Sequence, residues 1–152
     1  MVRGTKKWVR VEDSLAYRVH RLARLLRVQL LGMGRRAGVD LTPEQWFVLN
    51  KLRHRDGQSQ VELGESIFAD RPNMTRILQG LERREFVVRM QDEEDGRRHV
   101  VRLTDAGRDA HDRFAAMVPK ERARLFAGVS DEELAQVSEV LARIEDNVKR
   151  SL

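Results

Sequence analysis

Residues 59–81, with the sequence SQVELGESIFADRPNMTRILQGL, decide the fold of this chain. The stretch opens with Ser59 and Glu62 at the spacing of a capping box, in which a hydroxyl and a carboxylate satisfy free backbone N–H groups at a helix start. The spacing predicts a short helix that buries Val61 and Leu63. This helix is predicted to end near residues 67–68.

A second helix is predicted directly after the first, from Asp70 onward. Asp70 is placed as its N-cap, and Pro72 is tolerated in the first turn, where a backbone N–H would have no partner within the helix. The apolar face of this second helix consists of Met74, Leu78 and Leu81. Two short helices joined by a tight turn form the helix-turn-helix pattern.

A β-hairpin is predicted beyond Glu85, because the apolar period changes there from helical to two-residue. A second alternating stretch covers residues 99–103, and the polar loop of residues 91–98 between the two contains a glycine. The sequence therefore predicts two strands with a long tip. In the first strand the alternating apolar residues are Phe86, Val88 and Met90.

Two helices are predicted upstream of the motif. Thr42, Pro43 and Gln45 mark a helix start, as N-cap, first helical residue and closing member of a capping box. Before it lies a long helix over residues 12–36, with one apolar stripe and an arginine-rich opposite side. The stripe consists of Leu15, Val19, Leu22, Leu26 and Leu30.

Two further helices are predicted downstream of the hairpin. Thr104 caps a long helix that Pro119 perturbs, and Ser130 caps the last one. The last helix carries apolar residues at alternating three- and four-residue steps, which is the seam of helices that pack along each other. These residues are Leu134, Val137, Leu141, Ile144 and Val148.

The predicted fold is mainly α with a small β part (α+β), organised as one domain over residues 1–152. A winged helix-turn-helix unit occupies residues 41–103, between long helices at 12–37 and 104–152. One small winged unit cannot cover the apolar stripes on both sides, so we expect these outer helices to pack against a second copy. The sequence thus predicts a homodimer with N- and C-terminal dimerisation helices.

Composition points to a polyanionic partner. The chain has 29 Lys and Arg against 24 Asp and Glu, a net charge of +5, and it contains no cysteine, which excludes disulfides and thiolate metal sites. No apolar run approaches a membrane span, and the start of the chain lacks the apolar region of a signal peptide, so a cytoplasmic protein is expected. Basic residues are concentrated in residues 1–37, at Arg3, Lys6, Lys7, Arg10, Arg18, Arg21, Arg24, Arg27, Arg35 and Arg36.

The second helix of the motif has the chemistry to read DNA. Arginine can bind guanine with two hydrogen bonds and asparagine can bind adenine in the major groove. A two-fold dimer would place two such helices in successive major grooves about 34 Å apart, which favours a palindromic operator in double-stranded DNA. The residues early in this helix that are predicted to reach DNA are Arg71, Asn73, Thr75 and Arg76.

The hairpin tip adds Arg97 and Arg98, which suit the narrow and electronegative minor groove. Four acidic residues at 92–95 oppose this prediction. Our hypothesis is that Asp95 orients a neighbouring arginine through a bidentate pair, while the other carboxylates stay on the solvent side.

The segment Asp95-Gly96-Arg97, followed after five residues by Leu103-Thr104, resembles the D-x-R-x5-L-T signature of MarR-type regulators. The helix start at residues 41–46 and the stretch at 74–87 resemble the same family, and the likeness covers about residues 12–150. One departure is Glu85, where these proteins often carry glycine at the helix end.

The resemblance implies an obligate homodimer that binds a palindromic operator, usually as a repressor. It also implies an effector pocket between the dimerisation helices and the winged unit that accepts small aromatic or phenolic anions. By position, Arg76, Asp95 and Arg97 correspond to DNA-contacting elements, and Ser59 lies where a helix N-terminus meets phosphate. The peroxide-sensing branch needs a cysteine, and the urate-responsive branch places a carboxylate where Phe47 stands, so neither fits.

Two other kinds of function have different sequence requirements. His20, His54, His99 and His111 are scattered without a helical ligand spacing, and the serines fit helix caps better than a triad, so no metal, cofactor or catalytic site is predicted. An architectural protein that coats DNA through charge stays open as the alternative function. A regulator should prefer its operator by roughly 10³-fold or more, whereas a coating protein should show little preference and a steep salt dependence.

Overall fold

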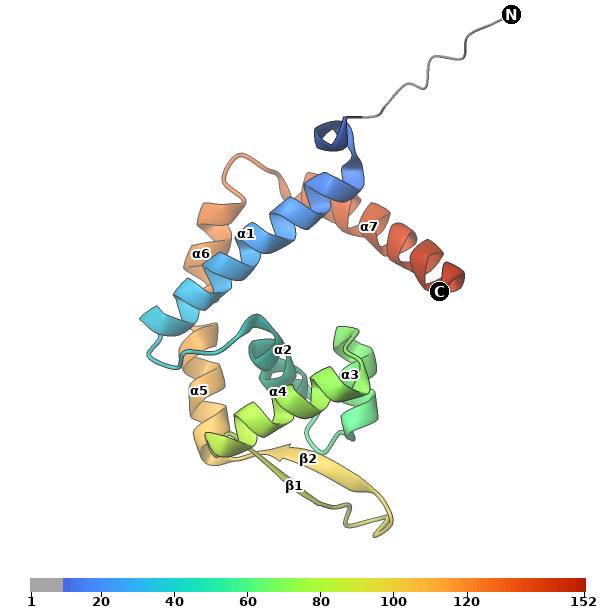
Figure 1. The fold of residues 1–152 in the computed structure, drawn as a ribbon. Helices are drawn as coiled ribbons and strands as arrows, with labels where there is room; N and C mark the ends of the chain where they lie inside the picture. The colour runs from blue at the N-terminus through green and yellow to red at the C-terminus, as the bar shows by residue number, and fades with distance from the viewer. Residues whose placement is uncertain (1–9) are drawn as a thin grey trace, which may run out of the picture. The chain divides into compact units, whose positions relative to one another are not determined.

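A computed structural model describes residues 10–152 and confirms a mainly helical, winged helix-turn-helix fold (Figure 1). The predictions for Arg3, Lys6 and Lys7 lie outside the described residues. The described chain divides into two compact units, the first ending at Ala116 and the second spanning Met117–Leu152. The elements are η1 (Val11–Asp13), α1 (Leu15–Arg36), α2 (Pro43–His54), α3 (Gln60–Ile67), α4 (Arg71–Arg83), β1 (Val87–Gln91), β2 (His99–Leu103), α5 (Asp105–Ala115), α6 (Val118–Leu125) and α7 (Asp131–Ser151).

Helix starts follow the predicted caps. Thr42, Ser59 and Ser130 each form a complete capping box at the start of α2, α3 and α7. Asp70 caps α4, and Thr104 caps α5 by accepting a hydrogen bond from a backbone N–H of the first turn. These predictions are confirmed because a cap depends only on residues three positions apart, which the sequence displays directly.

The core of the first unit lies between α2, α3, α4, β2 and α5. Leu49, Leu63 and Leu78 are fully buried there, and Trp46 stacks on Phe114 of α5 with ring centroids 4.3 Å apart. Helix α5 therefore belongs to the winged unit by its packing, although the sequence analysis grouped it with the dimerisation helices. Burial of Val61 was predicted wrongly, since its side chain is 67% exposed on the outer side of α3.

The wing is a two-stranded antiparallel sheet in which Val87 pairs with Leu103 and Gln91 with His99. Val101 extends the pairing by donating its N–H to the carbonyl of Gln58, at 2.8 Å, in the segment before α3. Only Val87 is buried in β1, whereas Val88 and Met90, on the predicted apolar face, are exposed. The hairpin thus packs on the unit mainly through β2.

Helices α1 and α7 keep their apolar stripes largely exposed. In α1 only Met33 and Gly34 are buried, and in α7 no residue is buried. The predicted effect of Pro119 is present as a break between α5 and α6, with the proline in the first turn of α6. Within residues 10–152, no helix combines the length and apolarity needed to cross a bilayer.

Candidate nucleic-acid interface

Helix α4 presents a polar face, and its first turn and its opposite face are fixed by contacts within the unit. The carboxylate of Asp70 accepts a hydrogen bond from the N–H of Asn73 at 2.8 Å, which fixes the first turn. Met74 and Leu78 anchor the opposite face in the core. Arg71, Asn73 and Arg76 are exposed on the polar face, and in the part of the chain that the structure describes no carboxylate pairs with either arginine. The side chains predicted to read bases are therefore available to a ligand.

Thr75, which was predicted to reach DNA, has a hydroxyl group that is hydrogen bonded within the unit. Its hydroxyl donates to the carbonyl of Arg71 at 2.9 Å and accepts from the amide of Gln60 on α3 at 2.8 Å. The other end of that amide accepts from Arg89 on β1 at 3.1 Å, and Arg89 also pairs with Glu82 on α4 at 3.0 Å. This chain of polar contacts connects α3, α4 and the wing. No sequence pattern pointed to Gln60 or Arg89 as its members.

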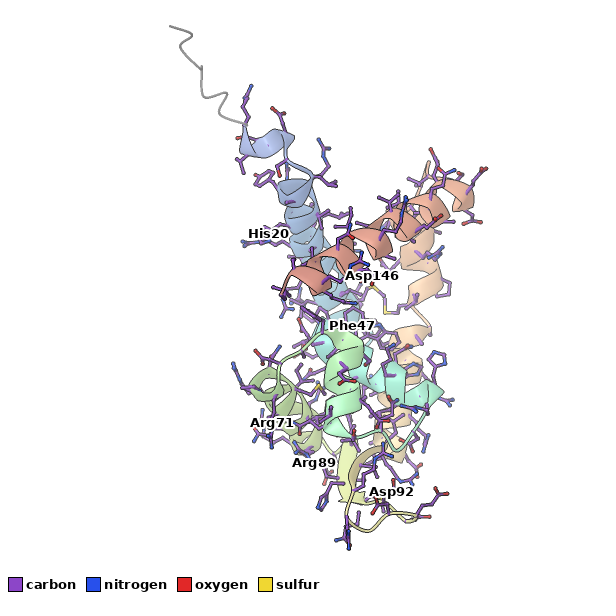
Figure 2. The ribbon with its side chains drawn as sticks, turned by 90° about the vertical axis from the view of Figure 1, so that its right-hand side faces the viewer. His20, Phe47, Arg71, Arg89, Asp92 and Asp146 are labelled. Carbon is purple, nitrogen blue, oxygen red and sulfur yellow. The ribbon has the colours of Figure 1, made fainter. Side chains whose placement is uncertain are left out.

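A groove of about 900 Å³ runs between α3 and the start of α4. Val61 and Phe68 line its apolar part, and Arg71 and Arg89 line its basic part. Phe68 ends α3 in the left-handed conformation, with φ of 54°, and its side chain is 72% exposed. Figure 2 labels Arg71 at α4, with Arg89 and then Asp92 following toward the hairpin tip. The groove is thus continuous with the polar face of α4.

The tip of the wing is organised by a turn around Asp95. Its carboxylate accepts the backbone N–H of Arg97 at 3.1 Å, and its carbonyl accepts the N–H of Arg98 at 2.9 Å. The bidentate pair predicted for Asp95 is wrong, because among the described residues its carboxylate binds this backbone N–H and no guanidinium. The side chain of Arg97 is exposed and has no carboxylate partner in residues 10–152.

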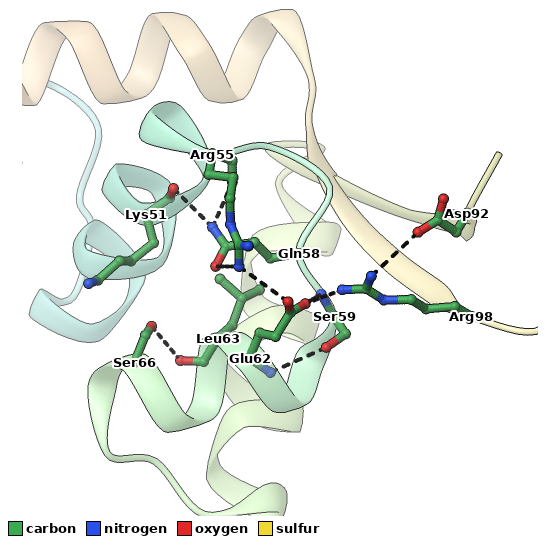
Figure 3. A network of polar contacts seen from close by, with 9 residues as sticks. All are labelled: Lys51, Arg55, Gln58, Ser59, Glu62, Leu63, Ser66, Asp92 and Arg98. Atoms are coloured by element: carbon green, nitrogen blue, oxygen red, sulfur yellow. Dashed lines mark hydrogen bonds and ion pairs between the residues drawn. The ribbon is translucent and has the colours of Figure 1, made fainter. Parts of the chain in front are cut away.

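Arg98, the next residue, is engaged on two sides (Figure 3). Its guanidinium pairs with Glu62 on α3 and lies 3.7 Å from the carboxylate of Asp92. The prediction that Asp92 stays on the solvent side is therefore wrong, since its side chain is only 18% exposed. Neighbouring arginines of the wing thus have opposite environments.

Glu62 accepts hydrogen bonds from three directions in this network (Figure 3). The donors are the N–H of Ser59 at 2.7 Å, the guanidinium of Arg55 at 3.2 Å, and Arg98. The backbone N–H of Ser59 is the main cause that lowers the pKa of Glu62 from 4.5 to about 2, and the Ser59 side chain and Arg98 add to it against partial burial. Sequence reasoning identified Glu62 only as a cap and missed these partners.

Ser59 itself is used as the N-cap of α3. Its hydroxyl accepts the N–H of Glu62 at 3.2 Å, so the predicted phosphate-binding position coincides with a structural cap. The first turn of α3 therefore keeps a fixed orientation.

Packing and hydrogen bonds within the unit explain the buried position of His111. His111 stacks on Trp46 with centroids 4.9 Å apart, and its ring nitrogens contact Asn50 and Asp112 at 3.2 and 2.8 Å. Its hydrogen bond is the main cause that lowers the pKa of Asp112. Across residues 10–152, no three histidine, aspartate or glutamate side chains gather as a metal site.

The sequence profile of the MarR family matches residues 41–99, which run from the start of α2 through the helix-turn-helix to β2. The winged unit of the chain is thus similar to that of MarR-family proteins. Members of this family are DNA-binding transcription regulators with a winged helix-turn-helix, so the match agrees with the site described above.

Solved structures of transcription regulators show the same architecture as this chain. The PcaV regulator from Streptomyces coelicolor, in complex with its natural ligand, is 25% identical over 96% of this chain and 98% of its own, with a TM-score of 0.80. A probable transcriptional regulator from Pseudomonas aeruginosa is 28% identical over 89% of this chain and 99% of its own, with a TM-score of 0.76.

The transcriptional repressor CouR has been solved with both kinds of partner. Bound to a 23-mer DNA duplex, it is 28% identical over 89% of this chain and 94% of its own, with a TM-score of 0.79. A second CouR structure contains p-coumaroyl-CoA.

Proposed function

We propose that this chain is a homodimeric regulator that binds a palindromic operator sequence-specifically and releases it when a small effector binds. The observation that carries the proposal is the pair of exposed cationic elements in the winged unit. Arg71 and Arg76 on α4 and Arg97 at the wing tip lack carboxylate partners among the described residues, although the chain carries many acidic side chains. Unpaired cations on two projecting elements fit a polyanion.

The recognition chemistry follows from the two elements. The first half of α4 enters the major groove, where Arg71 and Arg76 can bind guanine and Asn73 can bind adenine. Arg97 reaches the adjacent minor groove, whose negative potential favours an inserted arginine. The capped first turn of α3, beginning at Ser59, approaches a phosphate with its free backbone N–H groups. Bases are thereby read by α4, and the register is set by the other contacts.

Homodimerisation accounts for the exposed apolar stripes. Leu15 and Leu22 on α1 and Val137 on α7 are each more than half exposed. Burying such a side chain is worth about 1.5–3 kcal/mol, so the two helices together favour association with a second copy. Deleting residues 131–152 is expected to yield a monomer in sedimentation experiments, and a persisting dimer would refute the role of α7.

The effector class is proposed from the relatives. PcaV holds its natural ligand and CouR holds p-coumaroyl-CoA, whose acyl group is phenolic. We expect phenolic acids and their thioesters to lower the operator affinity of this chain, as for a repressor that is released by its ligand. The check is an operator titration with and without p-coumaric acid and p-coumaroyl-CoA, with an aliphatic thioester as control.

Selection of bound sequences from a random duplex pool tests the central proposal. We expect a palindrome with half-sites about one helical turn apart, bound roughly 10³-fold or more tightly than scrambled DNA. If no sequence is enriched and binding falls steeply with salt, the chain coats DNA without sequence preference and the proposal is refuted.

A matched pair of variants locates the binding face. Arg76→Ala is expected to weaken operator binding by about 1–3 kcal/mol and to relax the preference at one base position. Lys51→Ala removes the same charge from an exposed position of α2 and should change affinity little. Equal losses in both variants would indicate binding through overall charge.

A further inference from the structure

We infer that Arg98 is a strut that holds the wing against α3 and that Glu62 is the positioning residue that receives it. This inference rests on the proposed function, because it assigns the wing its place on the operator. Under this inference Arg98 does not contact DNA, although the sequence pattern predicted that it would together with its neighbour Arg97.

The carboxylate of Glu62 joins three segments of the winged unit (Figure 3). Its oxygens bind the N–H of Ser59 at the start of α3, the guanidinium of Arg55 in the segment after α2, and Arg98 in the wing. The first of these bonds is part of the capping box, so α3 holds the carboxylate independently of the wing. Glu62 therefore offers a rigid anchor to the hairpin.

The hairpin needs such an anchor because its tip has little else to hold it. Within the described chain, Arg98 is the side chain of residues 92–98 that forms a polar contact with α3. The tip is otherwise tied to itself, through the turn at Asp95 and the 2.8 Å bond from the N–H of Asp92 to the carbonyl of Arg98. Releasing Arg98 would let the tip, and Arg97 with it, move relative to α4.

Charge explains why Arg98 is a poor phosphate ligand. Glu62 and Asp92 face Arg98, and Arg55 adds a second guanidinium to Glu62, so the cluster has as many carboxylates as guanidinium groups. A neutral cluster releases few counterions when it meets a phosphate. Arg97, which has no such partner in residues 10–152, keeps its full charge for the DNA.

The salt dependence of operator binding separates the two arginines. Arg97→Ala should flatten the slope of log K against log salt by about two, as expected when each protomer of the dimer loses one phosphate neutralisation. Arg98→Ala should lower affinity by roughly tenfold, the size of one charge-assisted hydrogen bond, while leaving the slope unchanged. A slope reduced by about two in Arg98→Ala would make it a direct contact in both protomers and overturn the inference.

Glu62→Gln tests the anchor, because glutamine can still close the capping box but loses the ion pair. It should weaken operator binding as much as Arg98→Ala does, and the double variant should lose little more. Arg55→Ala is the matched control, since it removes another partner of Glu62 without touching the hairpin, and it should stay within about twofold of the wild type. Unchanged operator affinity in Glu62→Gln would show that Glu62 is not the residue that positions Arg98.

A measurement on the free protein makes the inference independent of DNA. Arg98→Ala and Glu62→Gln should both speed amide hydrogen exchange at Asp92, whose N–H bonds within the hairpin, and Arg55→Ala should not. Unchanged exchange in the first two variants would refute the inference that Arg98 holds the wing against α3. Failure of the wild type to select an operator would instead refute the proposed function, so the two failures are distinguishable.

Discussion

Gly107→Ala is expected to displace the wing, because Gly107 in the first turn of α5 lies directly against the backbone where the wing begins. A Cβ atom at this position would lie 2.0 Å from the carbonyl oxygen of Phe86 and 2.9 Å from its carbonyl carbon. Ordinary contacts begin at 3.4 Å, and the obstacle is backbone, so the first turn of α5 or the start of β1 must shift by roughly 1.4 Å.

Three effects set the expected loss of stability. Overpacking against backbone costs about 3 kcal/mol, at the upper end for added methyl groups. The shift also disturbs the cap in which Thr104 accepts the N–H of Gly107 at 3.0 Å, and losing a cap costs about 1 kcal/mol. Alanine regains about 1 kcal/mol of helix propensity over glycine. The net loss in free energy of unfolding is therefore about 3 kcal/mol.

Urea denaturation followed by circular dichroism, at one fixed protein concentration, measures this loss. Gly32→Ala in α1 is the matched control, because its Cβ would meet only the tip of the flexible Arg36 side chain at 3.2 Å. That variant should be as stable as the wild type or up to about 1 kcal/mol more stable. The reasoning is refuted if Gly107→Ala unfolds within about 0.5 kcal/mol of the wild type, or if both variants behave alike.

Three further predictions concern single side chains of the winged unit. Phe114→Ala should lower the free energy of unfolding by about 3–5 kcal/mol in the same denaturation assay, because this fully buried ring leaves a cavity beside Trp46. Thr42→Ala should cost about 1 kcal/mol through the loss of the α2 cap, and thermal melting would show it. Glu62 has a pKa of about 2 in the folded chain against 4.5. The stabilisation that the ionised Glu62 contributes is therefore complete above pH 4.5 and is lost as the pH falls toward 2. Between pH 5 and pH 3 the free energy of unfolding should fall less in Glu62→Gln than in the wild type.

Local features of this fold could be predicted from the sequence with little error. The capping boxes at Thr42, Ser59 and Ser130 each need two residues three positions apart, and the change from helical to two-residue period marks the hairpin. The signature from Asp95 to Thr104 coincides with the second half of the wing, because its spacing covers only the hairpin tip and β2. In each case the deciding contact lies within one element or one turn.

Features that depend on distant residues could not be predicted in this way. Glu62 meets Arg98 across 36 positions of sequence, and Asp56 accepts the N–H of Leu103 at 2.9 Å across 47. Periodicity also assigned Val61 to the core, whereas the packing of α3 turns its outer side to the solvent. Such contacts arise only when the hairpin folds back on the helix-turn-helix, and no local spacing records that geometry.

Counting basic residues also overstates the charge available to DNA. Arg55, Arg89 and Arg98 lie in or beside the winged motif, yet each is paired with Glu62 or Glu82. The three arginines proposed to bind DNA, counted in both protomers, would give a salt slope of about −5 if each neutralised one phosphate; they are Arg71, Arg76 and Arg97. A count of all arginines in the unit would predict a much steeper slope. The acidic residues beside the wing therefore divide its arginines into those that hold the hairpin and those that can bind DNA.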